Sequence, residues 1–309
     1  MSIMIFSQRK DVRPWLKALQ DARPDLDVRV YPDKRDNSEV TFALAWNHPM
    51  GAFRDFPNIK CIASMGAGAD HVLKDPELPQ DAVVTRIVDE NLTHDMGTFT
   101  LALALSHLRG LTGYKVHERS HVWWPQRYKR PADVTVGVMG LGVLGAHVAQ
   151  TLRLNGFTVN GWATAARPLD GVRTFAGAEA LPDFLAQADI LICLLPLTPS
   201  TANILNKETF AKLPQGAYVI NVARGEHLVD EDLVEMLDNG HLAGASLDVF
   251  RQEPLPAAHP FWSHPRIDIT PHIASTTEPA SVVGQILANY DRLQRNEALH
   301  HVVSRQKGY

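Results

Sequence analysis

Apolar and polar residues follow one another in blocks along the chain, and this pattern predicts short buried strands separated by helices. In the first third of the sequence, apolar runs predict strands at 3–6, 28–31, 42–46, 59–64 and 83–87. Residues 14–22 carry apolar side chains at helical spacing and predict an amphipathic helix. Strands that alternate with helices in this way indicate an open parallel α/β sheet.

The middle of the chain has a different pattern. Residues 97–113 predict a long helix whose apolar positions are too dense for an exposed one. Residues 114–132 read as irregular and contain Trp123-Trp124-Pro125 and the basic run Arg127-Tyr-Lys-Arg130. A solvated loop and a subunit contact both fit this segment.

From Asp133 onward the alternation resumes. Strands are expected at 134–139, 157–162, 189–195, 217–222, 243–249 and 267–270. A helix is expected at 230–239, with Asp230 as its cap and Gly240 as its stop, and a last long helix at 278–296. Two such regions in one chain predict an α/β protein with two doubly wound parallel-sheet domains, Rossmann-like or flavodoxin-like, and a cleft between them that favours a site.

A glycine motif joins the strand at 134–139 to the helix after it. The motif is G-x-G-x-x-G, with glycines at 140, 142 and 145. Gly140 permits the tight turn, Gly142 lets the backbone approach a pyrophosphate, and Gly145 lets the helix lie close to the strand. The N–H groups near Val143 and Leu144 would then face the phosphates at the helix N-terminus. The segment therefore predicts a dinucleotide site, although a purely structural glycine turn is the alternative.

Composition narrows the class of protein. The chain has 309 residues, 45% hydrophobic and 21% charged, which suits two globular domains. Its net charge of −4, without long runs of one sign, implies no nucleic-acid or membrane partner. The N-terminus reads as a short strand rather than a signal peptide. Cys61 and Cys193 lie in apolar runs and are expected to be reduced core thiols, which favours a cytoplasmic location. No metal site is predicted.

Three chemically useful side chains follow strands of the second region. Arg224, Glu253 and His272 come after successive predicted strands, so in a parallel sheet they share the edge that carries the glycine turn. Reduction of a ketone by hydride needs a proton donor, for which His272 is suited, and Glu253 would orient its ring. Arg224 can hold a substrate carboxylate and polarise the adjacent carbonyl. Taken singly, each residue could be structural; their joint placement favours a reductase centre.

Four segments resemble the signatures of the D-isomer-specific 2-hydroxyacid dehydrogenases. They are Gly140-Leu-Gly142-Val-Leu-Gly145, Asn221-Val-Ala-Arg224-Gly225, Leu247-Asp248-Val-Phe-Arg-Gln-Glu253-Pro254 and Thr270-Pro271-His272-Ile-Ala. Within that family the chain is most similar to the glyoxylate/hydroxypyruvate reductase A branch, through Trp46-Asn47, the stretch 64–70 and the C-terminal Gly308-Tyr309.

The resemblance implies several further assignments. It gives Arg224, Glu253 and His272 the roles stated above, and the backbone of Gly66-Ala67-Gly68 the substrate carboxylate. It implies a discontinuous substrate domain, 1–97 plus 283–309, and a dinucleotide domain, 98–282. It also implies a homodimer, with the region 99–130 as its contact. A plain strand-ending turn is the alternative for residues 66–68, and a core tryptophan for Trp46, which could otherwise limit the substrate pocket.

Further cofactor contacts are expected at the strand ends of the second domain. They are Leu195, Pro196, Val222, Ala223 and Asp248. One departure from the family occurs near the start of the first long helix, where members commonly carry a Glu and this chain reads Asp95-Met96-Gly97-Thr98. Met96 could pack on the nicotinamide or belong to the core.

The end of the strand at 157–162 bears on the choice between NAD and NADP. An acid there, about 20 residues beyond the glycine turn, would bind the adenosine ribose and repel a 2′-phosphate. This chain has no carboxylate until Asp170, and Thr164 and Arg167 could bind the phosphate. The prediction is a preference for NADP(H) over NAD(H). Binding of the 2′-phosphate is expected to be weaker than in relatives that carry an arginine at position 164.

The leading hypothesis is an NADPH-dependent reductase of small 2-keto acids such as glyoxylate and hydroxypyruvate. A bulkier D-2-hydroxy acid is an alternative substrate. Another Rossmann chemistry such as methyl transfer, and a non-catalytic nucleotide sensor on the same scaffold, remain alternatives; neither needs Arg224, Glu253 and His272 together.

Overall fold

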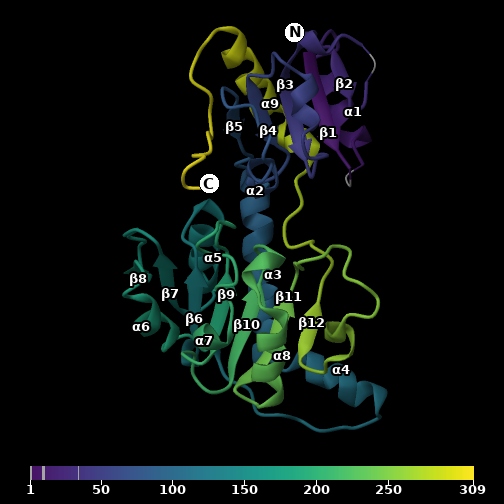
Figure 1. The fold of residues 1–309 in the computed structure, drawn as a ribbon. Helices are drawn as coiled ribbons and strands as arrows, with labels where there is room; N and C mark the ends of the chain where they lie inside the picture. The colour runs from purple at the N-terminus through teal and green to yellow at the C-terminus, as the bar shows by residue number, and fades with distance from the viewer. Residues whose placement is uncertain (1, 9–10, 34) are drawn as a thin grey trace. The chain divides into compact units, whose positions relative to one another are not determined.

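The computed structural model describes residues 2–8, 11–33 and 35–309 (Figure 1). The chain forms two compact units. Unit 1 comprises Met1–Leu92 with Thr276–Tyr309, and unit 2 comprises Thr93–Ser275. The first unit is thus discontinuous in sequence, and its limits fall a few residues before the expected domain boundaries at 97 and 283.

Unit 1 is built on a five-stranded parallel sheet of order β2-β1-β3-β4-β5. Its strands are β1 (Ser2–Ser7), β2 (Val28–Val30), β3 (Val40–Trp46), β4 (Cys61–Ser64) and β5 (Val83–Thr85). Its helices are α1 (Arg13–Ala22), α2 (Asp70–Leu73) and α9 (Pro279–Gln294), with short 3-10 turns η1 (Asn37–Glu39) and η2 (Ala52–Asp55). The five predicted strands and both predicted helices are confirmed.

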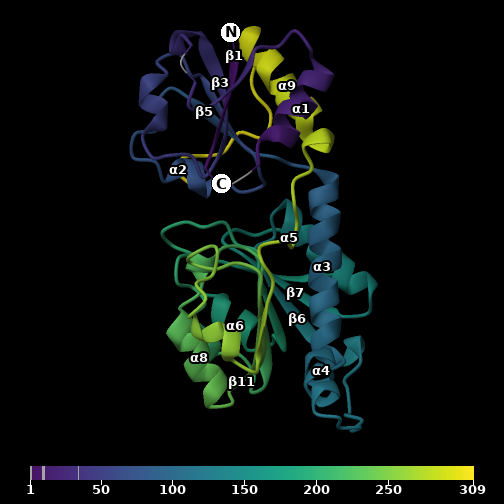
Figure 2. The same cartoon turned by 90° about the vertical axis from the view of Figure 1, so that its right-hand side faces the viewer.

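Alternation along β1 explains how this sheet is covered. Ile3 and Ile5 pack into a core with Trp15 of α1 and Ile286 of α9, and Figure 2 shows these two helices side by side. Met4 and Phe6 point to the other face, where Phe53 and Phe56 pack against Phe6. Both faces are buried, as expected of a parallel sheet.

Unit 2 contains a seven-stranded parallel sheet of order β12-β11-β10-β9-β6-β7-β8. Its strands are β6 (Thr135–Met139), β7 (Thr158–Ala163), β8 (Arg173–Ala176), β9 (Ile190–Cys193), β10 (Ala217–Asn221), β11 (Leu242–Leu247) and β12 (Ile267–Ile269). Its helices are α4 (Leu111–Arg119), α5 (Val143–Leu154), α6 (Leu181–Leu185), α7 (Lys207–Phe210) and α8 (Asp230–Asp238), with 3-10 turns η3 (Pro131–Asp133), η4 (Gly225–His227) and η5 (Pro260–Ser263).

Two apolar layers enclose the unit 2 sheet. On one face, Phe184, Phe210 and Leu233 from α6, α7 and α8 form a core with the strands. On the other face, Ala104 of α3 (Glu90–Leu108) and Val148 of α5 form a second core. Figure 1 shows α8 and α3 on these opposite faces. The prediction of two doubly wound parallel-sheet units is confirmed.

The long helix and the segment after it differ from the prediction. Helix α3 begins at Glu90, well before residue 97, and ends at Leu108. Gly110 then takes the left-handed conformation, φ +63°, and starts α4, which extends to Arg119. The prediction that 114–132 is irregular is therefore wrong up to Arg119. Gly113, the predicted helix end, lies inside α4 at an open position where an added Cβ would meet nothing within 4 Å.

Two smaller expectations also need correction. Strand β8 was not predicted, because Arg173–Ala176 is a short edge strand whose side chains are half-exposed or exposed. Asp230 does not cap α8: Val229 occupies the N-cap and Asp230 is the first helical residue. Gly240 follows that helix with φ +79°, so the predicted stop is confirmed.

Within residues 2–8, 11–33 and 35–309, no helix is both long and apolar enough to cross a bilayer, and no group of three metal-ligating side chains is present. Cys61 and Cys193 are free and buried, and burial raises the pKa of both thiols to about 12. The prediction of core thiols is confirmed.

Candidate active site

The three glycines of the turn after β6 have different surroundings. Gly140 has φ +100°, and a Cβ there would lie 2.7 Å from the Leu194 carbonyl oxygen. A Cβ on Gly145 would lie 1.7 Å from the Gly140 oxygen, so α5 approaches the turn closely. Around Gly142, which caps α5, an added Cβ meets nothing within 4 Å. Packing within the protein therefore explains glycine at positions 140 and 145. The open space at Gly142 is compatible with the approach of a pyrophosphate.

Residues after β7 extend toward the same turn. The guanidinium of Arg167 donates a hydrogen bond of 2.6 Å to the Leu141 carbonyl, which belongs to the glycine turn. Thr164 is exposed at the end of β7. Arg167 therefore lies next to the dinucleotide turn, and the binding of a 2′-phosphate by Thr164 and Arg167 stays a prediction. Met96 is buried in the core with Val148 and Leu141, which favours the core alternative for this residue.

His272 and Glu253 form a pair at the carboxyl edge of the unit 2 sheet. The His272 Nδ1 atom lies 2.8 Å from Glu253 Oε2, and about a third of each side chain is exposed, 33% and 30%. Burial of Glu253 would raise its pKa, but hydrogen bonds from His272 and the Phe250 amide and the charges of His272 and Arg224 lower it overall. Glu253 is therefore an ionised carboxylate that fixes the imidazole ring.

Asp248 organises the loop that carries His272. Its carboxylate is fully buried and accepts hydrogen bonds from the Thr270 hydroxyl at 2.6 Å and from the amides of Ile273 and Ala274 at 2.9 and 2.8 Å. His272 lies between these hydrogen-bonded residues in the chain and has φ +55°. The sequence suggested only a cofactor contact for Asp248, which stays a prediction. The sequence contains one indication of this structural role, because Asp248 is an acidic residue directly after a buried strand.

Arg224 is placed by two neighbours. Asn221, buried at the end of β10, donates through Nδ2 to the Arg224 carbonyl at 2.9 Å and accepts from the Ala223 amide at 3.2 Å. A Cβ on Gly225 would lie 1.9 Å from the Phe250 carbonyl carbon, so the Arg224 turn packs against the loop that leads to Glu253. Sequence reasoning missed Asn221, although an amide ending an apolar strand is a recognisable signal.

The other predicted cofactor contacts of unit 2 differ in exposure. Leu195, Val222 and Ala223 are 5%, 5% and 7% exposed, and Pro196 accepts a hydrogen bond from the Thr201 hydroxyl at 2.7 Å. Val143, at the start of α5, is 45% exposed, and Leu144 is half-buried. Their contacts with a cofactor stay predictions.

In unit 1, the turn of Gly66, Ala67 and Gly68 follows β4. The Ser64 hydroxyl donates to the Gly68 carbonyl at 2.6 Å and accepts from the Gly66 amide at 3.2 Å. Trp46, at the end of β3, packs on this turn: a Cβ on Gly66 would lie 2.5 Å from Cζ3 of the indole. The structure therefore brings together the turn and the tryptophan that the sequence singled out separately.

Comparison with known proteins identifies the family. The sequence model described as "D-isomer specific 2-hydroxyacid dehydrogenase, NAD binding domain" matches residues 101–274. The glyoxylate/hydroxypyruvate reductase A of Serratia proteamaculans (strain 568) is 38% identical over the full length of both chains. The chain belongs to the D-isomer-specific 2-hydroxyacid dehydrogenases.

Solved structures of this dehydrogenase family have the same fold. A D-isomer-specific 2-hydroxyacid dehydrogenase from Xanthobacter autotrophicus Py2, in complex with NADPH and MES, has a TM-score of 0.94 and 40% identity, covering 100% of this chain and 99% of that one. The NADPH-dependent glyoxylate/hydroxypyruvate reductase of Sinorhizobium meliloti, in complex with NADP and sulfate, has a TM-score of 0.94 and 37% identity, covering 100% of both chains. The predicted membership of this dehydrogenase family is confirmed.

Proposed function

We propose that this dehydrogenase reduces small 2-keto acids, with glyoxylate and hydroxypyruvate as leading substrates and NADPH as the preferred cofactor. The observation that carries the proposal is the 2.8 Å contact between His272 and Glu253, on the sheet edge that also bears the glycine turn. The full-length relatives named glyoxylate/hydroxypyruvate reductase A support the substrate class. The complexes of similar chains with NADPH or NADP support the cofactor.

Three side chains have separate roles in the proposed mechanism. The glycine turn would hold the pyrophosphate of NADPH, and the bound cofactor would supply the hydride for the ketone carbon. His272, fixed through Nδ1 by the Glu253 carboxylate, donates a proton from Nε2 to the oxygen, which becomes the hydroxyl. The Arg224 guanidinium binds the carboxylate of the oxo-acid and polarises its carbonyl.

The Gly66–Gly68 turn in unit 1 is proposed to bind the substrate carboxylate through its backbone N–H groups. Because the Gly66 amide already donates to Ser64, the amides of Ala67 and Gly68 are the proposed donors. The Trp46 indole packed on Gly66 would then limit the size of the group beside the keto carbon.

The test is steady-state kinetics with a panel of 2-keto acids and each cofactor. We expect NADPH oxidation with glyoxylate and hydroxypyruvate, and a higher kcat/KM for these than for an aromatic 2-keto acid. A preference for the aromatic substrate would select the alternative of a bulkier D-2-hydroxy acid. Nucleotide binding without turnover of any 2-keto acid would select the non-catalytic sensor.

The cofactor preference gives a separate prediction. Arg167→Ala should lower kcat/KM for NADPH about tenfold and leave kcat/KM for NADH within about twofold, because a guanidinium–phosphate contact is lost. The matched control is Arg173→Ala on β8, where the guanidinium lies 4.8 Å from the centre of the Phe175 ring. Equal losses with both cofactors, or a parent enzyme that uses NADH at least about tenfold better, would contradict the assignment.

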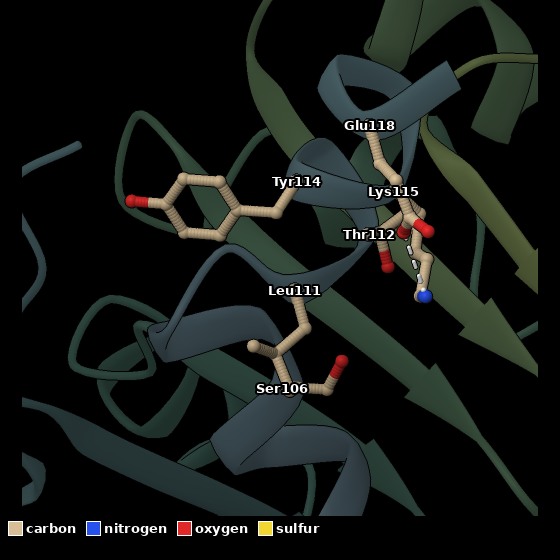
Figure 3. A pocket seen from close by; sticks show the side chains of 6 residues that line it. All are labelled: Ser106, Leu111, Thr112, Tyr114, Lys115 and Glu118. Atoms are coloured by element: carbon tan, nitrogen blue, oxygen red, sulfur yellow. Dashed lines mark hydrogen bonds and ion pairs between the residues drawn. The ribbon is translucent and has the colours of Figure 1, made fainter. Parts of the chain in front are cut away.

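We also propose a homodimer formed through an arm, defined here as residues 111–130. Trp123 and Trp124 are 97% and 66% exposed, and Leu111, Val116 and Tyr128 are more than half exposed. Figure 3 shows a hollow at the base of this arm, lined by six residues: Ser106, Leu111, Thr112, Tyr114, Lys115 and Glu118. Exposed apolar residues concentrated on one segment are typical of a protein interface, and a second copy of the chain fits the family resemblance.

Loss of the arm's tryptophans should dissociate this dimer. The parent is expected to sediment at twice the chain mass of 34.2 kDa, and Trp123→Ser with Trp124→Ser at the mass of one chain. Trp262→Ser, which changes a tryptophan that is 55% exposed outside the arm, is the control and should remain dimeric. A parent that sediments as a monomer at micromolar concentration would refute the proposal.

A cytoplasmic location is proposed as well, because both cysteines are free buried thiols and such thiols persist in a reducing compartment. Cell fractionation tests this proposal.

A further inference from the structure

A histidine and an aspartate are buried against each other in unit 1, outside every residue assigned so far. His48 Nε2 lies 2.8 Å from Asp75 Oδ2, and both side chains are 0% exposed. The His48 ring packs on Phe53, with ring centroids 4.4 Å apart. Burial lowers the pKa of His48, although Asp75 opposes this, so the neutral ring donates its Nε2–H to the carboxylate.

Asp75 links two segments of unit 1. Besides His48, its Oδ2 accepts from the Gly51 amide at 3.0 Å, and its Oδ1 accepts from the Glu77 amide at 2.9 Å. His48 and Gly51 belong to the loop that leaves β3, whereas Asp75 and Glu77 follow α2. One carboxylate therefore holds the loop after β3 against the chain that leaves α2.

These two segments begin at the proposed substrate end. Trp46 is two residues before His48, and Asn47 between them has φ +45°. Helix α2 starts directly after the Gly66–Gly68 turn and ends at Leu73, shortly before Asp75. The Trp46 indole also packs on His71 of α2, with ring centroids 4.7 Å apart, and His71 Nε2 lies 3.1 Å from the Ala45 carbonyl oxygen. The two segments joined by the His48–Asp75 pair are therefore the segments that follow Trp46 and the Gly66–Gly68 turn in the chain.

Stability alone is a poor reason to bury this pair. The desolvation of a carboxylate is costly, and apolar residues of similar volume often replace a buried pair without loss of stability. Within the described residues, His48 Nδ1 is buried and has no hydrogen-bond partner, which adds to the cost. The hydrogen bonds of Asp75 are better explained by a need to fix the loop after β3 relative to the chain that leaves α2.

We propose that His48 and Asp75 are positioning residues that set substrate-size selectivity, by holding the Trp46 loop against the Gly66–Gly68 turn. The proposal rests on the function proposed above. In this proposal neither side chain touches the substrate. A shift of the loop after β3 would displace both the Trp46 indole and the Gly66–Gly68 amides that are proposed to bind the carboxylate. Small misplacements of binding groups are expressed strongly in kinetics.

Three variants separate positioning from a merely structural role. His48→Leu removes the donor and keeps an apolar group of moderate size. His48→Gln retains a side-chain N–H that can reach Asp75. Arg54→Gln is the matched control, because Arg54 pairs with Glu77 across the same two segments but is 68% exposed. For each variant, KM and kcat are measured with glyoxylate and with an aromatic 2-keto acid, together with the unfolding temperature.

For His48→Leu we expect KM for glyoxylate to rise about tenfold with kcat within about threefold, and the preference for glyoxylate over the aromatic acid to narrow about tenfold. His48→Gln should restore both values to within about threefold of the parent, and Arg54→Gln should match the parent. If His48→Leu does not fold, Asp75→Asn is measured in its place with the same expectation.

A folded His48→Leu or Asp75→Asn enzyme with parental KM and selectivity, whatever its unfolding temperature, would overturn the inference. So would failure of both variants to fold when His48→Gln folds but does not restore KM and selectivity. These outcomes are read against an active parent. A parent that reduces neither substrate would instead overturn the proposed function.

Discussion

His272→Gln should lower kcat for glyoxylate reduction by about a hundredfold to ten-thousandfold, because the oxygen of the ketone would lose its proton donor. Nucleotide affinity should stay within about threefold, since His272 is not among the predicted nucleotide contacts at the glycine turn. Glu253→Gln should cause a smaller loss, because the imidazole remains but loses the carboxylate that orients it. Stopped-flow kinetics and NADPH titration measure the two effects separately.

His264→Gln is the matched control for this experiment. His264 Nε2 lies 3.3 Å from Asp238 Oδ1, so unit 2 contains a second histidine–carboxylate pair outside the proposed site. The control should retain at least about half of the parental kcat, because His264 lies outside the proposed site. A His272→Gln enzyme that keeps most of its activity would remove the proton-donor role.

Arg224→Lys should lower kcat/KM for glyoxylate by about a hundredfold or more, because an ammonium cannot reproduce the bidentate grip of a guanidinium on a carboxylate. The main chain around this position should be unaffected, since the Asn221 side chain holds the turn through the Arg224 carbonyl and the Ala223 amide. Kinetics with and without added guanidinium ion on Arg224→Ala give a second measurement, and partial rescue is expected.

The control for Arg224 is Arg266→Lys, an arginine of unit 2 that donates to the Leu237 carbonyl at 2.6 Å. It should leave kcat/KM within about twofold of the parent. If Arg224→Lys matched this control, the substrate carboxylate would have to bind elsewhere.

Periodicity and turn chemistry allowed much of the fold to be predicted from the sequence. The run from Val134 through Gly145 specifies strand, turn and helix, because only glycine fits at 140 and 145. The apolar runs of β9 and β10 are buried on both faces, and all of β11 except Ala243 is buried, as is typical of central strands of a parallel sheet. Once those strands are parallel, Arg224, Glu253 and His272 must share one edge.

Other features depend on contacts that no local pattern contains. The break between α3 and α4 follows from the conformation of Gly110, whereas Gly113 remains helical. Strand β8 exists because Asn160–Ala163 of β7 offers a partner edge, not because Arg173–Ala176 is strongly apolar. The pairing of His48 with Asp75 joins residues 27 positions apart. The sequence therefore offers candidates for the reacting groups, whereas residues such as His48 and Asp75 are found only from the fold.

Isotope tracing tests the central claim most directly. The enzyme is given hydroxypyruvate and NADPH that carries deuterium at the transferable C4 position, and the product is analysed by chiral chromatography and mass spectrometry. Direct hydride transfer to a 2-keto acid predicts D-glycerate with one deuterium at C2. Absence of product, or glycerate without the label, would contradict the account.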